Sequence, residues 1–438
     1  MVPLRLLLPG DPDRQAVLAR LFRRESASAP EVLGRAQKII DTVRRGGDRA
    51  LRELTRELEG RELTEIEIRR DAWDALADRT PADVQAALSR AHERIRRFHD
   101  EEAARLGAAG FLLEEGPARL GLRLTPLQRV GLYAPGGTAR YPSSVLMGAA
   151  AARAAGVGEL LMTTPGPSPE VLHAARVAGV DRVFALGGAQ AIAAFAHGTE
   201  SVPRVDKIIG PGNAYVAAAK RLVFGDVAID QVAGPSEILI LATPGGGAAP
   251  AWIAADLLSQ AEHDTDAYAV LVTPSETLAR AVAAEVARQL ADLPRRDIAA
   301  QSLAAHGAAV VVGSLDEAID FAERFAPEHL ELLCEDARAQ AGRIRSAGAL
   351  FIGPYTPEAA GDYYAGPNHV LPTGGAARFG SPLGVHDFLK RTSILEYGAE
   401  TLAAHAADIR RLAEVEGLDA HGRAVALRTA SQDKETAS

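Results

Sequence analysis

The sequence predicts an α/β fold with two Rossmann-like parallel-sheet domains and a small helical C-terminal tail. Two observations predict this class. From about residue 117, short apolar runs alternate with Ala-rich amphipathic stretches, as in a parallel sheet covered by helices on both faces. At 438 residues, the chain also has room for two or three domains of roughly 150 residues each.

The part before this alternation, residues 11–108, is expected to be mainly helical. Charged and apolar residues recur at helical spacing through Ala29–Glu59, with an interruption at Gly46-Gly47, and through Pro81–Leu106. Between them, Leu63–Arg69 alternates enough to predict a strand or a sheet edge.

Two series of strands and helices follow. The first series predicts buried strands at Arg129–Tyr133, Glu159–Thr164, Arg182–Leu186, Lys207–Ile209 and Glu237–Thr243, separated by helices at 143–155, 168–178, 189–197 and 213–223. The second predicts helices at Ala251–His263, Ser275–Leu290 and Asp316–Phe325, and strands at Ala267–Val272, Ala308–Val312 and Ala349–Ile352. Residues 355–392 lack a period, which is typical of a functional loop, and 399–428 predicts two helices.

Composition narrows the class of protein. Apolar residues make up 47 % and charged residues 24 % of the chain, which is ordinary for a globular protein. The net charge of −9 argues against a nucleic acid partner. The single cysteine, Cys334, excludes an internal disulfide and a zinc site built from thiolates alone. Because Met1–Pro9 is short and broken by prolines, and no membrane span stands out, we expect a cytoplasmic protein without a membrane partner.

The segment Ala326–Leu332 contains a candidate acid–base pair, Glu328 and His329. Pro327 suits the first position of a helix, so both residues are expected in a first helical turn. The positive end of the helix disfavours an imidazolium and would keep His329 neutral. A neutral histidine is a candidate general base.

Two further segments offer metal ligands. Gln260 and His263 are three residues apart and would share one face of a helix, where an amide oxygen and an imidazole could ligate a divalent ion. The segment 361–375 places Asp362 and His369 in a loop whose glycines would let the backbone approach a ligand. Near the C-terminus, Gly417 suits a helix stop and Asp419 an N-cap, which puts His421 in a first turn beside Glu416.

Three glycine-containing turns follow predicted strands and precede helices. They are Tyr133-Ala134-Pro135-Gly136-Gly137, Gly187-Gly188-Ala189-Gln190 and Gly210-Pro211-Gly212-Asn213. Ligands bind at such strand ends, although no complete G-x-G-x-x-G fingerprint is present. Taken singly, each turn fits a tight strand–helix connection, the Gln260 and His329 clusters fit solvated helix ends, and the His421 cluster fits a plain helix–helix connection.

Taken together and in this order, these motifs resemble the histidinol dehydrogenase family over roughly residues 30–428. The resemblance rests on the three turns above and on Tyr141–Met147, Ala233–Glu237, Gln260–His263, Ala326–His329, Gly361–Tyr363 and Asn368–Thr373. One departure is the run Gly148–Arg153, because the family usually has Met-Asn and then a Pro-Ala-Lys-Val-type continuation after Tyr-Pro-Ser-Ser, so helix packing or nucleotide contacts near it are expected to differ.

The resemblance implies a site residue by residue. Zinc would be held by Gln260, His263, Asp362 and His421, the last reaching in from the second subunit of a homodimer. His329 would shuttle protons and Glu328 would activate water. The substrate would contact the zinc ligands, His329, Ser236, His369 and Glu416, and NAD would contact Tyr133, Gln190 and Asn213.

The same resemblance shapes the expected domains. Residues 28–128 with 240–380 would form a discontinuous first α/β domain carrying the metal and catalytic residues. Residues 129–239 would form a second α/β domain with the NAD-binding turns, and 381–438 an extension whose helix pair reaches a partner subunit.

The implied reaction is the oxidation of L-histidinol to L-histidine through bound L-histidinaldehyde with two NAD, the end of histidine biosynthesis. A thiohemiacetal route would need a nucleophilic cysteine, whereas Cys334 follows an apolar run and is expected to be packed. A related dehydrogenase of another small diol, such as a sulfonated propanediol, remains an alternative. A zinc hydrolase and a non-catalytic binding protein are weaker ones.

Overall fold

The computed structural model describes residues 4–24, 30–105, 110–136 and 141–430. Gly137 of the first glycine turn therefore lies outside the described residues, as do the ends of some predicted segments. The chain forms two compact units, a larger one of Met1–Glu102 and Leu127–Phe388 and a smaller one of Ala103–Pro126 and Leu389–Ser438. None of the helices in the described ranges is long and apolar enough to span a bilayer.

The first sheet of the larger unit has the strand order β2-β7-β6-β5-β8-β9, parallel except where β2 meets β7. Its strands are β2 (Glu67–Ile68), β5 (Arg129–Tyr133), β6 (Glu159–Thr163), β7 (Arg182–Phe184), β8 (Lys207–Ile209) and β9 (Ala228–Ile229). The surrounding helices are α2 (Pro30–Glu59), α3 (Arg70–Ala77), α4 (Ala82–Arg105), α5 (Pro142–Ala154), α6 (Pro169–Val177), α7 (Gly188–His197) and α8 (Ala214–Val223).

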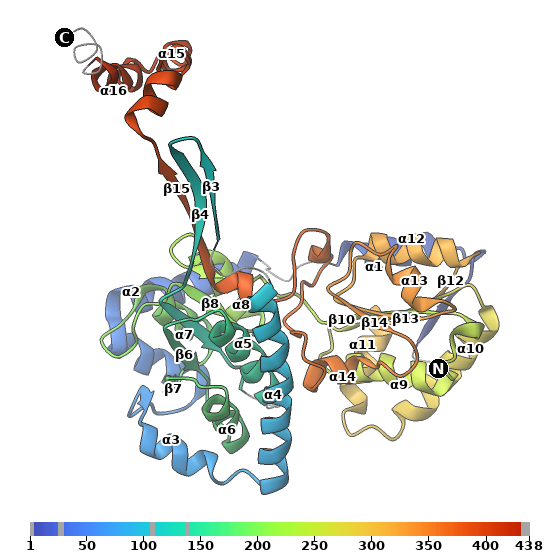
Figure 1. The fold of residues 1–438 in the computed structure, drawn as a ribbon. Helices are drawn as coiled ribbons and strands as arrows, with labels where there is room; N and C mark the ends of the chain where they lie inside the picture. The colour runs from blue at the N-terminus through green and yellow to red at the C-terminus, as the bar shows by residue number, and fades with distance from the viewer. Residues whose placement is uncertain (1–3, 25–29, 106–109, 137–140, 431–438) are drawn as a thin grey trace. The chain divides into compact units, whose positions relative to one another are not determined.

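Helices cover this sheet on both faces (Figure 1). One face shares a core with α2, α7 and α8, centred on Phe184 and Phe195. On the other, the atypical run after Met147 lies inside α5, where a side chain at Gly148 would come within 2.9 Å of Leu132. Small residues there allow α5 to pack closely on the sheet, which is a local reason for the departure from the family pattern.

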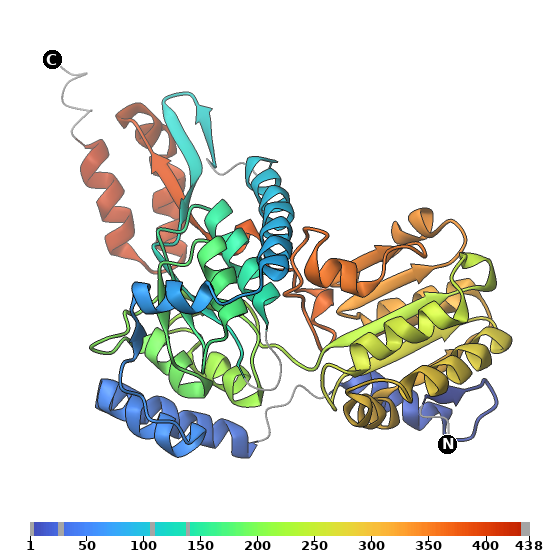
Figure 2. The ribbon, with the colours of Figure 1, turned by 90° about the horizontal axis from the view of Figure 1, so that it is seen from below.

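The second sheet of the larger unit is parallel, in the order β1-β12-β11-β10-β13-β14. Its strands are β1 (Arg5–Leu7), β10 (Glu237–Ala242), β11 (Tyr268–Thr273), β12 (Ala308–Val311), β13 (His329–Leu333) and β14 (Ala349–Ile352). Its helices are α1 (Arg14–Arg23), α9 (Pro250–Ala261), α10 (Glu276–Leu290), α11 (Arg296–His306), α12 (Leu315–Phe325), α13 (Ala337–Ala341) and α14 (Glu358–Tyr363). One core joins the sheet to α9, α10 and α11, and another joins it to α1, α12 and α13 (Figure 2).

The smaller unit combines a three-stranded antiparallel sheet with a helix pair. The strands, in the order β15-β4-β3, are β3 (Phe111–Glu115), β4 (Ala118–Pro126) and β15 (Leu389–Glu396). The helices α15 (Ala399–Val415) and α16 (Asp419–Thr429) pack on each other. Gly417, with φ 70°, ends α15 as predicted, but Asp419 is the first residue of α16 and Leu418 takes the cap position.

The predicted fold class is confirmed, with two parallel sheets and a helical C-terminal pair. The helix expected to start at Pro327 is wrong, because His329–Leu333 is strand β13. Strands β1, β3, β4, β9 and β15 had no counterpart in the sequence prediction.

The domain boundaries differ from the packing in two places. Helix α2 and strand β2 join the sheet of β5 to β9, where Ile40 and Leu51 enter its core, whereas residues 28–128 were expected with 240–380. The second sheet begins at Glu237, inside the range 129–239 expected for the other domain, and it takes β1 from the N-terminal segment. Apolar periodicity shows that a helix packs, but it does not show which of two sheets it packs on.

Candidate active site

The largest concentration of predicted site residues surrounds one cavity of about 480 Å³ in the larger unit. From the first sheet, the turns after β5 and β8 contribute residues such as Tyr133 and Asn213. From the second sheet, the amino ends of β10 and β13 contribute Ser236, Glu328 and His329. Strands β5 and β8 are the neighbours at which the order of the first sheet reverses, and ligands bind at the carboxyl ends of strands at such a point.

His329 is the first residue of β13 and is only 4 % exposed. Its Nδ1 lies 2.9 Å from the main-chain oxygen of Glu237, which can only accept, so Nδ1 carries a proton and donates it. Nε2 has no hydrogen-bond partner among the described residues and lies 3.6 Å from Asp362 Oδ1. The tautomer therefore leaves Nε2 free to accept a proton.

The charge state of His329 depends on the carboxylates around it, not on a helix end. Burial opposes the imidazolium, but the carboxylates of Glu358, Glu328 and Asp362 outweigh burial and raise the pKa of His329 well above its ordinary value. A divalent cation held by Glu358 and Asp362 would offset their charge and favour the neutral base. Neutrality of His329 thus depends on the metal group described below.

Glu328, just before β13, is 6 % exposed and accepts a hydrogen bond from the Glu237 N–H at 2.8 Å. Burial raises the pKa of its carboxyl to about 8, although the neighbouring His329 lowers it. Glu328 Oε2 lies 3.7 Å from His329 Nδ1, so the two groups are close without sharing a hydrogen bond. A carboxyl with a pKa near 8 can both take up and release a proton near neutral pH.

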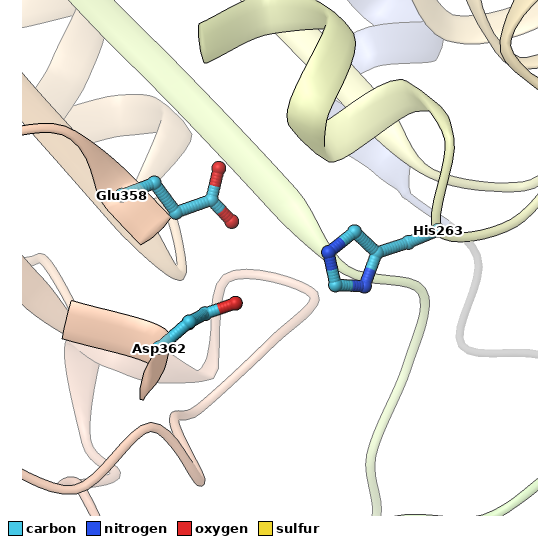
Figure 3. A group of neighbouring side chains, drawn as sticks. All are labelled: His263, Glu358 and Asp362. Carbon is cyan, nitrogen blue, oxygen red and sulfur yellow. The ribbon is translucent and has the colours of Figure 1, made fainter. Parts of the chain in front are cut away.

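A second group, His263, Glu358 and Asp362, has the composition of a metal site. Each residue offers one ligand atom, and these atoms all lie within 4.8 Å of one another. Figure 3 shows the three side chains converging from two elements, the end of α9 and helix α14. Burial lowers the pKa of His263, which favours the neutral imidazole that a metal requires.

Local sequence explains how α14 carries two of these carboxylates. Glu358 and Asp362 are four residues apart, so they lie on one face of the helix. Gly361 lets α14 approach β14 closely, because a Cβ at this position would lie 2.6 Å from the Phe351 ring. A larger residue at 361 would displace Asp362 from the group.

Gln260, on the last turn of α9, tests whether a cation fits. Its side-chain oxygen faces the carboxylate of Glu358 and its nitrogen faces N–H donors, so neither has a complementary partner. Turning the amide would let it donate to Glu358 and accept from the Glu237 N–H at 3.3 Å. A cation between the Gln260 oxygen and Glu358 satisfies the oxygen without that rotation, and oxygen with imidazole ligands suits zinc and similar ions. The residues present therefore fit a divalent metal.

The three predicted nucleotide residues occupy different surroundings. Tyr133 and Asn213 line the cavity, where the Tyr133 hydroxyl accepts from the Gly188 N–H at 3.1 Å and Asn213 caps α8. Gln190 is buried, donates to Glu59 at 2.9 Å, and does not line the cavity. Gly210 has φ +107° and its Cβ position is 2.2 Å from the Tyr133 carbonyl oxygen, so only glycine fits this turn.

The remaining predicted residues divide between the two units. Ser236 and His369 line the cavity, and His369 Nδ1 bonds the main-chain oxygen of Asp362 at 2.9 Å. Burial lowers the pKa of His369. Glu416 and His421 belong to the smaller unit and are exposed there.

Cys334 follows the carboxyl end of β13, whereas His329 begins it, so the two are about 16 Å apart along the strand. It is 5 % exposed, and burial raises the pKa of its thiol. We expect Cys334→Ser to keep kcat within about twofold, since a buried thiol of raised pKa is a poor nucleophile. Steady-state kinetics of the folded variant check this, and a loss of 100-fold or more would revive a covalent route.

Two residues of the site were missed by sequence reasoning. Glu358 lies in the aperiodic segment 355–392, but its spacing from Asp362 matched a helix face and could have revealed it. Glu237 opens an otherwise apolar strand and is fully buried, a placement that a charged residue takes only with partners.

A buried acid–base pair beside a metal-type group, facing the turns of a nucleotide-type sheet, is the arrangement expected of a metal-dependent α/β dehydrogenase. A family model described as histidinol dehydrogenase matches residues 22–429. The chain belongs to the histidinol dehydrogenase family, whose members are NAD-dependent oxidoreductases that use zinc.

Individual relatives agree with this assignment. The chain is 50 % identical over 432 residues to the histidinol dehydrogenase of Geobacter sulfurreducens, covering 97 % of this chain and 100 % of the relative. It is 49 % identical over 430 residues to that of Nitrosomonas europaea, covering 97 % and 98 %. A crystal structure of histidinol dehydrogenase from Elizabethkingia anophelis superimposes with a TM-score of 0.89 at 32 % identity, covering 98 % of this chain and 99 % of that one.

Proposed function

We propose that this chain oxidises L-histidinol to L-histidine through bound L-histidinaldehyde and reduces two NAD in the process. The observation that carries the proposal is the free Nε2 of His329, which lies 3.6 Å from Asp362 of the metal-type group, in a cavity that the turns of a nucleotide-type sheet also line. Family membership supports the same substrate.

Zinc would be held by Gln260, His263 and Asp362, with Glu358 beside them, and when bound it orients the substrate and polarises its oxygen. In the first half-reaction, His329 Nε2 takes the hydroxyl proton while the carbinol carbon gives hydride to NAD. The products are the aldehyde, reduced cofactor and one proton. The aldehyde stays bound in the cavity for the second step.

In the second half-reaction, Glu328 takes one proton from water as the water oxygen adds to the aldehyde carbon, and His329 returns the proton it took in the first step to the aldehyde oxygen, which gives the hydrate. His329 then takes a hydroxyl proton from the hydrate while the carbon gives its remaining hydride to a second NAD. The carboxylic acid formed loses its proton and leaves as the carboxylate. The Glu237 main chain holds both groups, Glu328 through its N–H and His329 through its carbonyl, so they keep their places through both steps.

The decisive test mixes the zinc-loaded protein with L-histidinol and NAD. We expect two reduced nicotinamides per histidine formed. Reduction with another small diol but not with histidinol would favour the paralogous activity. Product formed without any reduced cofactor would favour a hydrolase.

Glu328→Gln is expected to separate the half-reactions. Loss of this carboxylate should slow aldehyde oxidation by about 100-fold and alcohol oxidation by less than about tenfold, since only the second step consumes water. Stopped-flow reduction of NAD with histidinol and with histidinaldehyde as separate substrates measures both. Equal losses in the two would contradict the assignment of Glu328 to water.

We also propose a homodimer in which His421 and Glu416 of the partner subunit complete each site. Both side chains are exposed on the smaller unit, which also exposes apolar residues suited to burial against a second copy, namely Phe111, Leu112, Leu113, Leu395, Leu412, Val415 and Leu427. An NAD-consuming biosynthetic reaction supports our placement of the protein in the cytoplasm.

Subunit mixing tests the shared site. His263→Ala and His421→Ala should each be inactive alone as homodimers. After random mixing, half of the dimers contain one subunit of each variant, and each of these has one intact site of two. The mixture should therefore regain about one quarter of wild-type activity. No regained activity in a mixture shown to contain mixed dimers would place His421 outside the partner's site.

A further inference from the structure

Glu237, the first residue of β10, contacts both members of the acid–base pair through its main chain. Its N–H donates to Glu328 at 2.8 Å, and its carbonyl accepts from His329 Nδ1 at 2.9 Å. The orientation of the pair therefore depends on where the Glu237 backbone lies. Glu237 itself does not line the cavity.

The Glu237 carboxylate is fully buried and anchors that backbone. It accepts from the Gly374 N–H at 2.7 Å and from the Glu328 N–H at 3.3 Å. Its charged partner is the guanidinium of Arg24, whose side chain is 2 % exposed. A buried carboxylate keeps its charge and place only when such partners satisfy it.

Arg24 joins this carboxylate to the segment that leads into β13. Its guanidinium also donates to the Phe325 carbonyl and lies 3.8 Å from the centre of the Phe325 ring. Phe325 is the last residue of α12, three positions before Glu328. One side chain thus ties the start of β10 to the approach of β13, the two strands that present the pair.

Backbone dihedral angles indicate that the contact between Arg24 and the end of α12 is conformationally constrained. Among the described residues other than glycine, positive φ occurs at Arg24 (27°), Ala326 (48°) and Asp336 (51°). Two of these three belong to the contact between Arg24 and the end of α12. Strained backbone persists only where the surrounding structure fixes it, and it concentrates at functional sites.

We propose that Arg24 is a positioning residue for the reaction, acting through Glu237 to hold Glu328 and His329 in register with the metal group; this inference rests on the function proposed above. Arg24 touches neither the cavity nor the metal group. Without its charge, the buried Glu237 carboxylate loses the guanidinium it is paired with and shifts, and the main chain that orients the pair shifts with it.

The test compares Arg24→Ala with Arg14→Ala. Arg14 is the first residue of α1, the helix that ends next to Arg24, but it donates to the carbonyls of Leu7 and Val311, at the carboxyl ends of β1 and β12. We expect Arg24→Ala to lower kcat by about 100-fold in both half-reactions with little change in KM for NAD, since misplacement of reacting groups by about 1 Å has effects of that size. Arg14→Ala should keep kcat within about twofold.

Added guanidinium, at concentrations that leave the wild type unchanged, gives a readout that lost stability alone would not move. It should restore kcat of Arg24→Ala by about tenfold or more and leave Arg14→Ala unaffected. Arg24→Lys serves if the alanine variant does not fold, because a point charge cannot reach both Glu237 and the Phe325 carbonyl. We expect a loss of about tenfold in kcat for Arg24→Lys with normal zinc content.

Three outcomes would overturn the inference: wild-type kcat in a folded Arg24→Ala or Arg24→Lys enzyme, a loss of activity that guanidinium does not relieve, or an equal loss in Arg14→Ala. Failure of the proposed function is distinguishable, because it would appear in the wild type as no NAD reduction with histidinol. If the wild type is active and the Arg24 variants are equally active, the positioning role of Arg24 is rejected and the proposed function is kept.

Discussion

Replacing His329 by asparagine should lower kcat by about 1,000-fold in both half-reactions, within the range that loss of a general base produces. Both hydride transfers require a proton to leave the reacting oxygen, and Nε2 of His329 is positioned to accept it. Asparagine is the informative replacement. Its amide nitrogen can still donate to the Glu237 carbonyl in place of Nδ1, but it offers no base in place of Nε2.

The pH profile should report the same group. Wild-type kcat is expected to fall as the pH drops through the pKa of His329, because the imidazolium cannot accept a proton. In His329→Asn this fall in kcat at low pH, the acid limb of the profile, should disappear. His306→Asn, a change in a partly buried histidine whose ring centre lies 4.4 Å from that of Tyr268, should keep both the rate and the profile. An unchanged acid limb in His329→Asn would assign it to another group.

The sequence predicted the elements of this site better than their surroundings. Most strands of both sheets were located, because apolar runs between Ala-rich helices have a clear period. The exposed hairpin of β3 and β4 was missed, since β3 buries none of its residues and so shows no such period. Strand β15 was missed for the same reason, as all of its residues are partly or fully exposed.

Pro327 shows why one signal can mislead. Proline suits the first turn of a helix, but it is equally common just after a helix has ended. Here α12 ends at Phe325 with Ala326 in the left-handed conformation, so Pro327 leads out of a helix and into β13. Glu331 concealed that strand, because a charged residue interrupts its apolar run although it is fully buried.

The carboxyl-end rule predicted only half of the site. It applies to the first sheet, where the turns after β5 and β8 line the cavity. The second sheet contributes the amino ends of β10 and β13, and α9 runs back to that edge, which brings Gln260 and His263 there. Contacts between residues distant in sequence decide which edge of a sheet faces a neighbouring sheet. Local sequence patterns therefore cannot predict that edge.

Removal of a metal ligand is the second substitution for which we expect a large loss of kcat. His263→Ala should lose bound zinc and lower kcat by at least about 1,000-fold, since mispositioned substrate and an unpolarised oxygen affect both steps. Metal content by elemental analysis and kcat measure this directly. Glu262→Gln is the matched control, because Glu262 neighbours His263 in sequence but lies outside the metal group. Full zinc content in folded His263→Ala would contradict the assignment.

Proton release on zinc binding tests the same group without relying on catalysis. Burial raises the pKa of Glu358 to about 8, so without metal this carboxyl is mostly protonated at pH 7. A cation bound beside Glu358 favours the carboxylate form, so binding at pH 7 should release about one proton from Glu358, in addition to any that His329 gives up. The number released should fall as the pH rises above 8, where the carboxyl is already ionised. Calorimetry in buffers of different ionisation enthalpy counts these protons. Glu358→Gln should lower the measured count by about one proton, whereas a count unchanged by this substitution would show that the Glu358 carboxyl does not face the metal.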